Sequence, residues 1–209
     1  MHRHFLSGVF RITRICCRKI VRLMINRPIV IVGFMGSGKT SVAAAVASEL
    51  NCDAIDLDSF ITEELQRTPK EIIEEDGEDR FREIETKMLG RVLANETRRA
   101  LVIAAGGGAW TIAENRKTIR QHEALVVWLD AAFDLCWKRI ESTDETRPLA
   151  RSRRMAENLY LERRAVYQLA DAYVVVDETK SVAEIATEVA DAVLRQEDEG
   201  GRSFKDKSN

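Results

Sequence analysis

The most informative segment of the sequence is a glycine-rich stretch that can bind phosphate. Residues 33–40 read Gly-Phe-Met-Gly-Ser-Gly-Lys-Thr and fit the pattern G-x-x-x-x-G-K-[ST]. In such a stretch, which we call the phosphate loop, backbone N–H groups converge on a phosphate, the lysine reaches the β- and γ-phosphates, and the hydroxyl can bind Mg²⁺. We therefore predict that a nucleoside triphosphate binds here. The residues expected to contact it are Gly33, Gly36, Ser37, Gly38, Lys39, Thr40 and Ser41.

The phosphate loop alone does not distinguish a motor, a GTPase and a small-molecule kinase. About 170 residues lie between Arg27 and the C-terminal tail. This length leaves no room for a second domain that a motor would move, so a motor protein is disfavoured. The sequence has no N-K-x-D motif, which would be needed to read a guanine base. A small-molecule kinase is therefore favoured.

Three aspartates are candidates for binding Mg²⁺ or an acceptor hydroxyl. Asp56 and Asp58 end an expected strand, and a D-x-D pair there directs both carboxylates to the sheet edge where ligands of α/β folds bind. One can organise Mg²⁺ and its waters while the other contacts the acceptor. A solvated acidic turn would explain the pair equally well. Asp130 also follows an apolar run and could bind the metal, but we interpret it as the N-cap of the next helix.

Two further segments could take part in binding. In the run Gly-Glu-Asp-Arg-Phe-Arg-Glu-Ile-Glu at residues 77–85, Arg82 and Glu85 are three residues apart, so that Glu85 could hold the guanidinium in place. Charged helices are usually only solvated, however. The three glycines at residues 106–108 leave the backbone room to approach a ligand, or simply mark a tight exit from a strand.

The composition excludes several other classes of protein. With 45% hydrophobic and 32% charged residues, the chain is neither disordered nor embedded in a membrane. The longest uncharged run, residues 100–113, is too short to span a bilayer. The four cysteines form no C-x-x-C pair, which indicates a reducing compartment and predicts a cytoplasmic location. The three histidines are too few and too badly placed for a catalytic triad or a zinc site.

The formal net charge of −2 hides an uneven distribution. No Asp or Glu precedes Glu49, whereas eight Lys or Arg do. In the basic extension, residues 1–26, apolar side chains recur at steps of three and four with arginines on the other side, as in an amphipathic helix. The extension could be a membrane-surface or targeting segment, or translation could start at Met24.

The elements that must position these residues alternate along the chain. Strands are expected at residues 28–32, 53–56, 101–105, 124–129 and 172–176. Helices are expected at residues 41–50, 59–66, 78–96, 132–141, 156–170 and 182–194. Short apolar strands separated by helices predict an α/β fold with a parallel sheet and right-handed crossovers.

In order and at similar spacing, these motifs resemble the shikimate kinase family. The resemblance is carried by the phosphate loop, the Asp56/Asp58 pair, the G-E-x-x-F-R-x-x-E run at residues 77–85 and the glycines at 106–108. Downstream, Thr-Arg-Pro-Leu at 146–149 resembles the family's lid motif, and Arg-Arg-Ala-Val-Tyr at 163–167 resembles its R-x-P-L-Y segment. The resemblance covers nearly everything from residue 25 to residue 194.

This resemblance implies a fold and an activity. The activity is phosphorylation of the 3-hydroxyl of shikimate, with ATP as co-substrate and Mg²⁺ as cofactor. The fold is a three-layer, P-loop nucleoside-monophosphate-kinase-like α/β fold, in which helices flank a five-stranded parallel sheet. The kinase domain would span residues 27–196, with a mobile lid at about residues 142–163. The polar, glycine-containing composition of residues 197–209 separately predicts a disordered tail. Beyond shikimate and ATP we expect no nucleic-acid partner, no stable membrane insertion and a monomeric state.

The resemblance also implies roles on the acceptor side of the site. Asp58 would bind the acceptor hydroxyls and help to remove the proton. Arg82 and Arg163 would clamp the carboxylate, and the Gly107 backbone would touch the ring hydroxyls. Because Ala-Val stands at 165–166 where the family has Pro-Leu, Arg164 remains an alternative to Arg163. We interpret Tyr167 as a packing residue.

On the nucleotide side, the resemblance implies that Asp56 holds Mg²⁺ through water, together with Thr40. Arg147 would swing in with the lid and, with Lys39, stabilise the transferring phosphoryl group. Arg139 is the candidate for stacking on adenine.

Two other functions remain open at this stage. A sister kinase acting on another small polyol acid, such as gluconate, could share the phosphate loop, but it would not need the F-R-x-x-E run together with three glycines. A non-catalytic nucleotide-binding regulator should have lost an acceptor or lid group, whereas Asp58, Arg82 and Arg147 are all in place.

Overall fold

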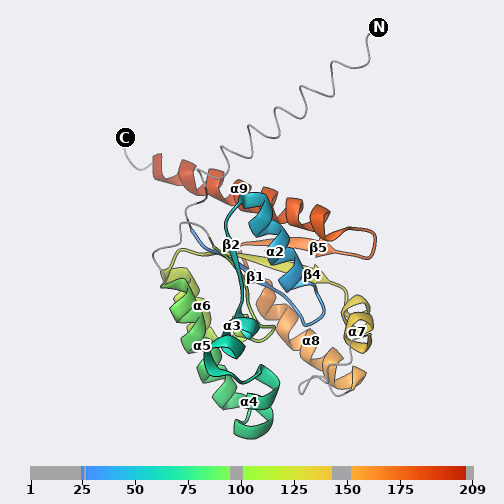
Figure 1. The fold of residues 1–209 in the computed structure, drawn as a ribbon. Helices are drawn as coiled ribbons and strands as arrows, with labels where there is room; N and C mark the ends of the chain where they lie inside the picture. Colours follow the sequence, from blue (N-terminus) through green and yellow to red (C-terminus); the bar gives the residue numbers. More distant parts are fainter. Residues whose placement is uncertain (1–24, 26, 95–100, 143–151, 206–209) are drawn as a thin grey trace.

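A five-stranded parallel sheet forms the centre of the molecule (Figure 1). The computed structural model describes residue 25 and residues 27–94, 101–142 and 152–205. The strands lie in the order β2-β3-β1-β4-β5, and each neighbouring pair is parallel. Their bounds are Ile29–Val32 for β1, Asp53–Asp56 for β2, Leu101–Ala104 for β3, Leu125–Ala131 for β4 and Ala172–Val176 for β5. The predicted α/β fold and its five strands are confirmed.

The central strands are apolar because both faces of the sheet are covered. Every residue of β1 and β3 is buried, as expected for parallel strands between two helical layers. The chain moves from β1 outward to β2, returns to β3, and then continues on the other side of β1 with β4. The strand order therefore reverses at β1, and ligands of doubly wound folds bind at the carboxyl ends of the strands at such a point.

Helices lie on both sides of the sheet (Figure 1). On one side, α2 (Lys39–Leu50) and α9 (Val182–Lys205) pack against each other and against the strands. On the other side lie α5 (Glu78–Leu93), α6 (Ala113–Gln121) and α8 (Arg153–Tyr167). The remaining helices among the described residues are α3 (Leu57–Leu65), α4 (Pro69–Asp76), the 3₁₀ helix η1 (Ala109–Thr111) and α7 (Phe133–Glu141). None of the helices described is both long and apolar enough to cross a bilayer.

Helices α4 and α6 escaped the sequence prediction because each is mostly polar. In α4 only Ile72 is buried, and in α6 only Asn115 and Ile119. A local signal for α4 does exist, since Thr68 and Glu71 form a reciprocal capping box.

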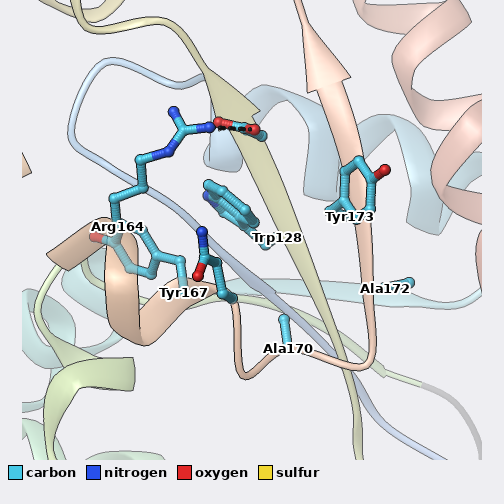
Figure 2. A pocket seen from close by; sticks show the side chains of 8 residues that line it. Trp128, Arg164, Tyr167, Ala170, Ala172 and Tyr173 are labelled. Carbon is cyan, nitrogen blue, oxygen red and sulfur yellow. Dashed lines mark hydrogen bonds and ion pairs between the residues drawn. The ribbon is translucent and has the colours of Figure 1, made fainter. Parts of the chain in front are cut away.

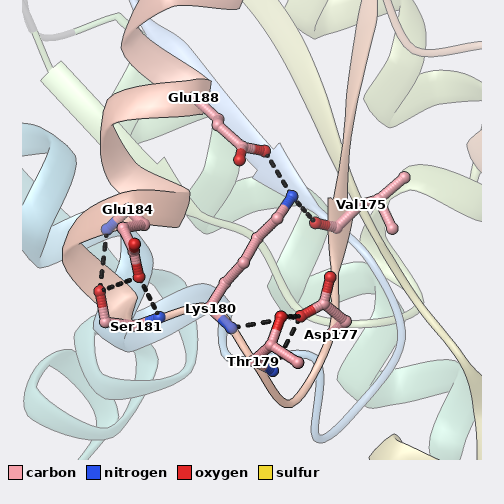
Figure 3. Close-up of polar contacts among 7 residues, drawn as sticks. All are labelled: Val175, Asp177, Thr179, Lys180, Ser181, Glu184 and Glu188. Atoms are coloured by element: carbon pink, nitrogen blue, oxygen red, sulfur yellow. Dashed lines mark hydrogen bonds and ion pairs between the residues drawn. The ribbon is translucent and has the colours of Figure 1, made fainter.

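A second capping motif starts α9, the longest helix (Figure 3). The Glu184 backbone donates to Ser181 Oγ at 3.2 Å, and the Glu184 carboxylate accepts from the Ser181 backbone at 2.8 Å. Just before it, Lys180 Nζ donates to Val175 O and Glu188 Oε2, which ties the end of β5 to α9. The helix therefore begins at a defined residue beside the last strand.

Two sequence predictions need correction. Asp130 is not the N-cap of α7, because it lies within β4 and α7 begins after Ala132 without a side-chain cap. Its carboxylate instead accepts a hydrogen bond from Arg164. The tail predicted from residue 197 also starts too early, since α9 continues to Lys205 and the Glu197 carboxylate accepts from Arg27 Nε at 2.6 Å.

Candidate active site

The phosphate loop connects the end of β1 to the start of α2, at the point where the strand order reverses. Gly36 and Gly38 have φ angles of 78° and 93°, which most other residues avoid. A β-carbon at Gly36 would also lie 2.6 Å from the carbonyl oxygen of Cys136. The chain can therefore fold tightly over the N-terminus of α2, where N–H groups and the helix dipole favour a phosphate.

Polar side chains of the phosphate loop are already oriented. Lys39 Nζ donates to the carbonyl oxygen of Phe34 at 2.9 Å, and Ser37 is buried with no hydrogen-bond partner for its hydroxyl among the described residues. Thr40 and Ser41 are exposed at the first turn of α2. Arg139 on α7 donates to the carbonyl oxygen of Gly36 at 3.1 Å, so this predicted adenine-stacking residue contacts the loop backbone.

The predicted metal ligands lie together. Thr40 Oγ1 donates to Asp56 Oδ2 at 2.6 Å, although the two residues are 16 positions apart. The other oxygen of Asp56 accepts from the Ser59 backbone at 3.0 Å and caps α3. The acidic-turn interpretation is therefore also correct for Asp56, which caps a helix while facing the phosphate loop. A hydroxyl and a carboxylate supply the oxygen ligands that Mg²⁺ prefers.

The glycines at 106–108 bring the backbone close to the charged side chains of the acceptor side. A β-carbon at Gly108 would lie 2.5 Å from Arg82 Nη2, and one at Gly107 would lie 3.3 Å from Arg163 Nη1. These glycines are therefore needed for a close approach to two arginines and not only for a turn.

Gly106 has the same role toward two carboxylates. A β-carbon there would overlap Glu85 Oε1 and would lie 3.3 Å from Asp58 Oδ1. Asp58 stands in the first turn of α3, directly after the end of β2. The structure thus gathers residues from three distant segments, α3, α5 and α8, around residues 106–108.

Arg82 is held by two carboxylates from its own helix. Arg82 Nη1 lies 2.7 Å from Glu85 Oε2, and Nη2 lies 2.9 Å from Glu78 Oε1. Burial works against the charge of Arg82, but the ion pairs outweigh it and raise the pKa of the guanidinium. Burial raises the pKa of the Glu85 carboxyl, which the Arg82 charge opposes. Glu85 is fully buried, and its Oε1 has no hydrogen-bond partner among the described residues.

Arg163 and Arg164 have different surroundings, which separates the two alternatives left open by the sequence. Arg163 is 7% exposed and faces Gly107, and burial lowers the pKa of its guanidinium. In the described part of the chain no ion pair includes Arg163, whereas Arg164 pairs with Asp130 at 3.0 Å. A buried cation beside open backbone is suited to an incoming anion. The geometry therefore favours Arg163.

Tyr167 does more than pack, which the sequence did not indicate. It is buried against Trp128, with ring centroids 6.1 Å apart. Its hydroxyl donates to the carbonyl oxygen of Gly107. Its place four residues after Arg163, on the same helix face, was the available signal.

The two halves of the site meet at Gly107. A β-carbon there would lie 3.5 Å from the Met35 backbone nitrogen and 3.6 Å from the Gly33 carbonyl oxygen, both in the phosphate loop. Arg147 and part of the predicted lid lie outside the described residues. Within the described ranges, no three His, Cys, Asp or Glu side chains cluster around a possible metal position.

A phosphate loop that lies beside an acceptor side lined with arginines is the arrangement of a P-loop kinase that phosphorylates small molecules. The family profile described as Shikimate kinase matches residues 35–194. The chain belongs to the shikimate kinase family.

Relatives and solved structures agree with this assignment. The chain is 39% identical over 174 residues to a shikimate kinase of Mesorhizobium japonicum, covering 81% of this chain and 82% of the relative. It is 35% identical over 169 residues to that of Prochlorococcus marinus, covering 79% and 82%. The structure of an Acinetobacter baumannii shikimate kinase in complex with shikimate matches with a TM-score of 0.76 at 29% identity, covering 84% of this chain and 98% of that one. A Sinorhizobium meliloti gluconokinase, at 19% identity and a TM-score of 0.57, shares the fold alone.

Proposed function

We propose that this chain transfers the γ-phosphoryl group of ATP to the 3-hydroxyl of shikimate. The observation that carries the proposal is the meeting of the two halves of the site at Gly107. Gly107 lies against the Arg163 guanidinium on one side and the phosphate loop on the other. An acid bound by Arg163 therefore has its hydroxyls next to a nucleotide bound by the loop.

Arg82 and Arg163 together bind the carboxylate of the acceptor. A planar guanidinium can form two parallel bonds to a carboxylate, which a lysine cannot do. Glu85 and Glu78 hold Arg82 in place, while Arg163 is fixed by its burial in α8. The acceptor side therefore selects a small acid rather than an uncharged polyol.

Asp58 accepts a hydrogen bond from the acceptor hydroxyl and takes its proton as the oxygen bonds to the γ-phosphorus. The bond from that phosphorus to the β–γ bridging oxygen breaks, and ADP leaves. Negative charge spreads over the phosphoryl oxygens in the transition state, so that positioned cations contribute most of the catalysis. Lys39 supplies one cation, and Arg147 is our candidate for a second.

Thr40 and Asp56 are the residues that would hold Mg²⁺ with the nucleotide. Their oxygens lie 2.6 Å apart and match the hard ligands that this ion requires. The ion would neutralise charge on the β- and γ-phosphates.

An assay of ADP release with shikimate and, separately, gluconate tests the proposal. We expect turnover that depends on shikimate and on Mg²⁺, and little with gluconate. Folded protein that binds ATP but shows no shikimate-dependent turnover would contradict the proposal and favour a non-catalytic regulator. Turnover with gluconate alone would assign the acceptor side to another polyol acid.

Replacing Asp58 tests the assignment of the base. Asp58→Asn should abolish most turnover while the affinity for ATP barely changes, because the loss concerns only the acceptor hydroxyl. Asp53→Asn, at the start of the preceding strand β2, is the matched control and should leave both unchanged. A large loss of ATP affinity in Asp58→Asn would mean that the residue belongs to the nucleotide side.

We also propose that the enzyme acts as a monomer in the cytoplasm, without nucleic acid as a partner. Light scattering after size exclusion measures the oligomeric state, and a dimer at micromolar concentration would contradict the first point. Mass spectrometry of the native N-terminus would show whether residues 1–23 are present in the cell or removed on import into an organelle.

A further inference from the structure

Arg164 lines a hollow between α8, β4 and the start of β5 (Figure 2). Its Nη2 donates to Asp130 Oδ2 at 3.0 Å, and its Nη1 donates to the Tyr160 hydroxyl at 2.7 Å. The guanidinium also stacks over Trp128, 5.3 Å from the ring centroid. The side chain is thereby fixed in one place by three neighbours.

Tyr160 extends these contacts toward the phosphate loop. Its hydroxyl donates to the carbonyl oxygen of Ala131 at 3.0 Å, next to Asp130 in β4. Its ring meets the ring of Phe34, in the phosphate loop, edge to face at a centroid distance of 5.3 Å. Arg164 and Tyr160 therefore attach α8 to the strand and the loop that carry the nucleotide side.

The position of Arg163 depends on the rotation of α8 about its axis. Consecutive helical residues point about 100° apart, so that Arg163 faces Gly107 only while Arg164 faces Asp130. A rotation of α8 that moved Arg164 away from Asp130 would also move Arg163 away from Gly107. We propose that Arg164, held by Asp130 and Tyr160, is a positioning residue that sets the rotation of α8 and thereby places Arg163 beside Gly107.

This role predicts a local effect and not a loss of fold. The side chains of Arg164 and Asp130 are 40% and 17% exposed, and ion pairs of this kind contribute little to global stability. Small misplacements of a substrate-binding group can nevertheless reduce catalysis strongly. Affinity for the acceptor acid should therefore change more than thermal stability does.

The test compares the KM values of Arg164 variants with those of a matched control variant. The use of shikimate as the acceptor in this test rests on the proposed function. Arg164→Gln should raise KM for shikimate about tenfold while KM for ATP stays unchanged. Arg164→Lys, which keeps the charge but lacks the planar guanidinium with its two separate donor nitrogens, should fall between wild type and Arg164→Gln. Arg91→Gln removes a similar ion pair and ring contact elsewhere, between α5 and α3, and should leave both KM values unchanged.

Asp130→Asn provides a second test of the same link. It should raise KM for shikimate in the same direction, and its combination with Arg164→Gln should be no worse than Arg164→Gln alone, because both remove one interaction. Fully additive effects would overturn the inference. An unchanged KM for shikimate in Arg164→Gln would also overturn the inference. So would an equal rise in KM for shikimate and KM for ATP together with a large fall in Tm, because that pattern indicates a general loss of structure.

A measurement without substrates separates this inference from the proposed function. Backbone amides of residues 163–167 should exchange with deuterium faster in Arg164→Gln than in wild type or Arg91→Gln. If wild type did not phosphorylate shikimate, the proposed function would fail, but faster exchange would still support the positioning role. Unchanged exchange at residues 163–167 would overturn the positioning role, whatever the activity.

Discussion

The nucleotide side and the acceptor side of the site are built in different ways. The phosphate loop is eight consecutive residues, and its shape follows from local backbone preferences. The acceptor side combines the first turn of α3, the start of α5, residues 106–108 and the end of α8. One anion site is therefore encoded locally, whereas the other exists only after the chain has folded.

Glycine shows the difference most clearly. Gly36 and Gly38 are needed for their backbone angles, 78° and 93° in φ. Gly108 has an ordinary φ of −100° and is needed because a β-carbon would collide with Arg82. Glycine is thus required for the backbone conformation on the nucleotide side and for the close packing of a side chain on the acceptor side.

The largest expected effect comes from the cation of the nucleotide side. Lys39→Met should reduce kcat about 1000-fold, because a positioned charge on the transferring phosphoryl group is lost. Lys138→Met, which removes a lysine from an exposed ion pair on α7, is the control and should retain full activity. Comparable activity in the two variants would contradict the role of Lys39.

The next effect should be confined to ATP. Gly36→Ala introduces a β-carbon at a positive φ and against the Cys136 carbonyl oxygen, and we expect KM for ATP to rise about 100-fold. Binding of shikimate to the enzyme without nucleotide, measured by calorimetry, should change little. A loss of shikimate binding as large as that of ATP would mean that the two halves do not act separately.

The reciprocal variant addresses the acceptor side. Gly108→Ala should displace Arg82 and raise KM for shikimate about 30-fold, with KM for ATP unchanged. Gly90→Ala is the matched control, because a β-carbon at this position in α5 has nothing within 4 Å. Since alanine favours helix over glycine, Gly90→Ala should raise Tm slightly without changing KM for either substrate. An effect of Gly108→Ala on ATP alone would reverse the assignment of the two halves.

The smallest effect should come from a segment outside both halves. Thr68→Ala removes the capping box of α4 and should lower Tm by about 2–4 °C without affecting kinetics. Hydrogen bonds from the Thr68 backbone N–H and hydroxyl lower the pKa of Glu71 below its ordinary value of 4.5.

This lowered pKa gives the Thr68→Ala effect a pH dependence. A carboxyl with a lowered folded pKa stabilises the protein above its unfolded pKa, and the stabilisation is lost as pH falls through the folded pKa. The Tm difference between wild type and Thr68→Ala should therefore be largest near neutral pH and shrink below pH 4.5. A difference that grew in acid would contradict the link to Glu71.

Sequence reasoning succeeded where a signal is local and failed where partners come from elsewhere. All five strands were predicted. The central strands β1 and β3 are apolar without interruption, as buried parallel strands are, whereas β2 and β5 are partly exposed. The role of Asp130 was wrong, because an aspartate before a helix resembles an N-cap unless its partner on another helix, Arg164, is known. The choice between Arg163 and Arg164 also required the rotation of α8.

The amino-acid sequence by itself determined the phosphate loop, the order of the five strands along the chain and the residue types for acid recognition. These depend on backbone preference and on periodicity, which act over a few neighbouring residues. Only the tertiary structure decided that Thr40 meets Asp56, that Arg163 faces Gly107, and that Arg82 lies against Gly108. Each of these contacts joins elements whose relative position follows from packing of the whole sheet and its helices, which no single segment encodes.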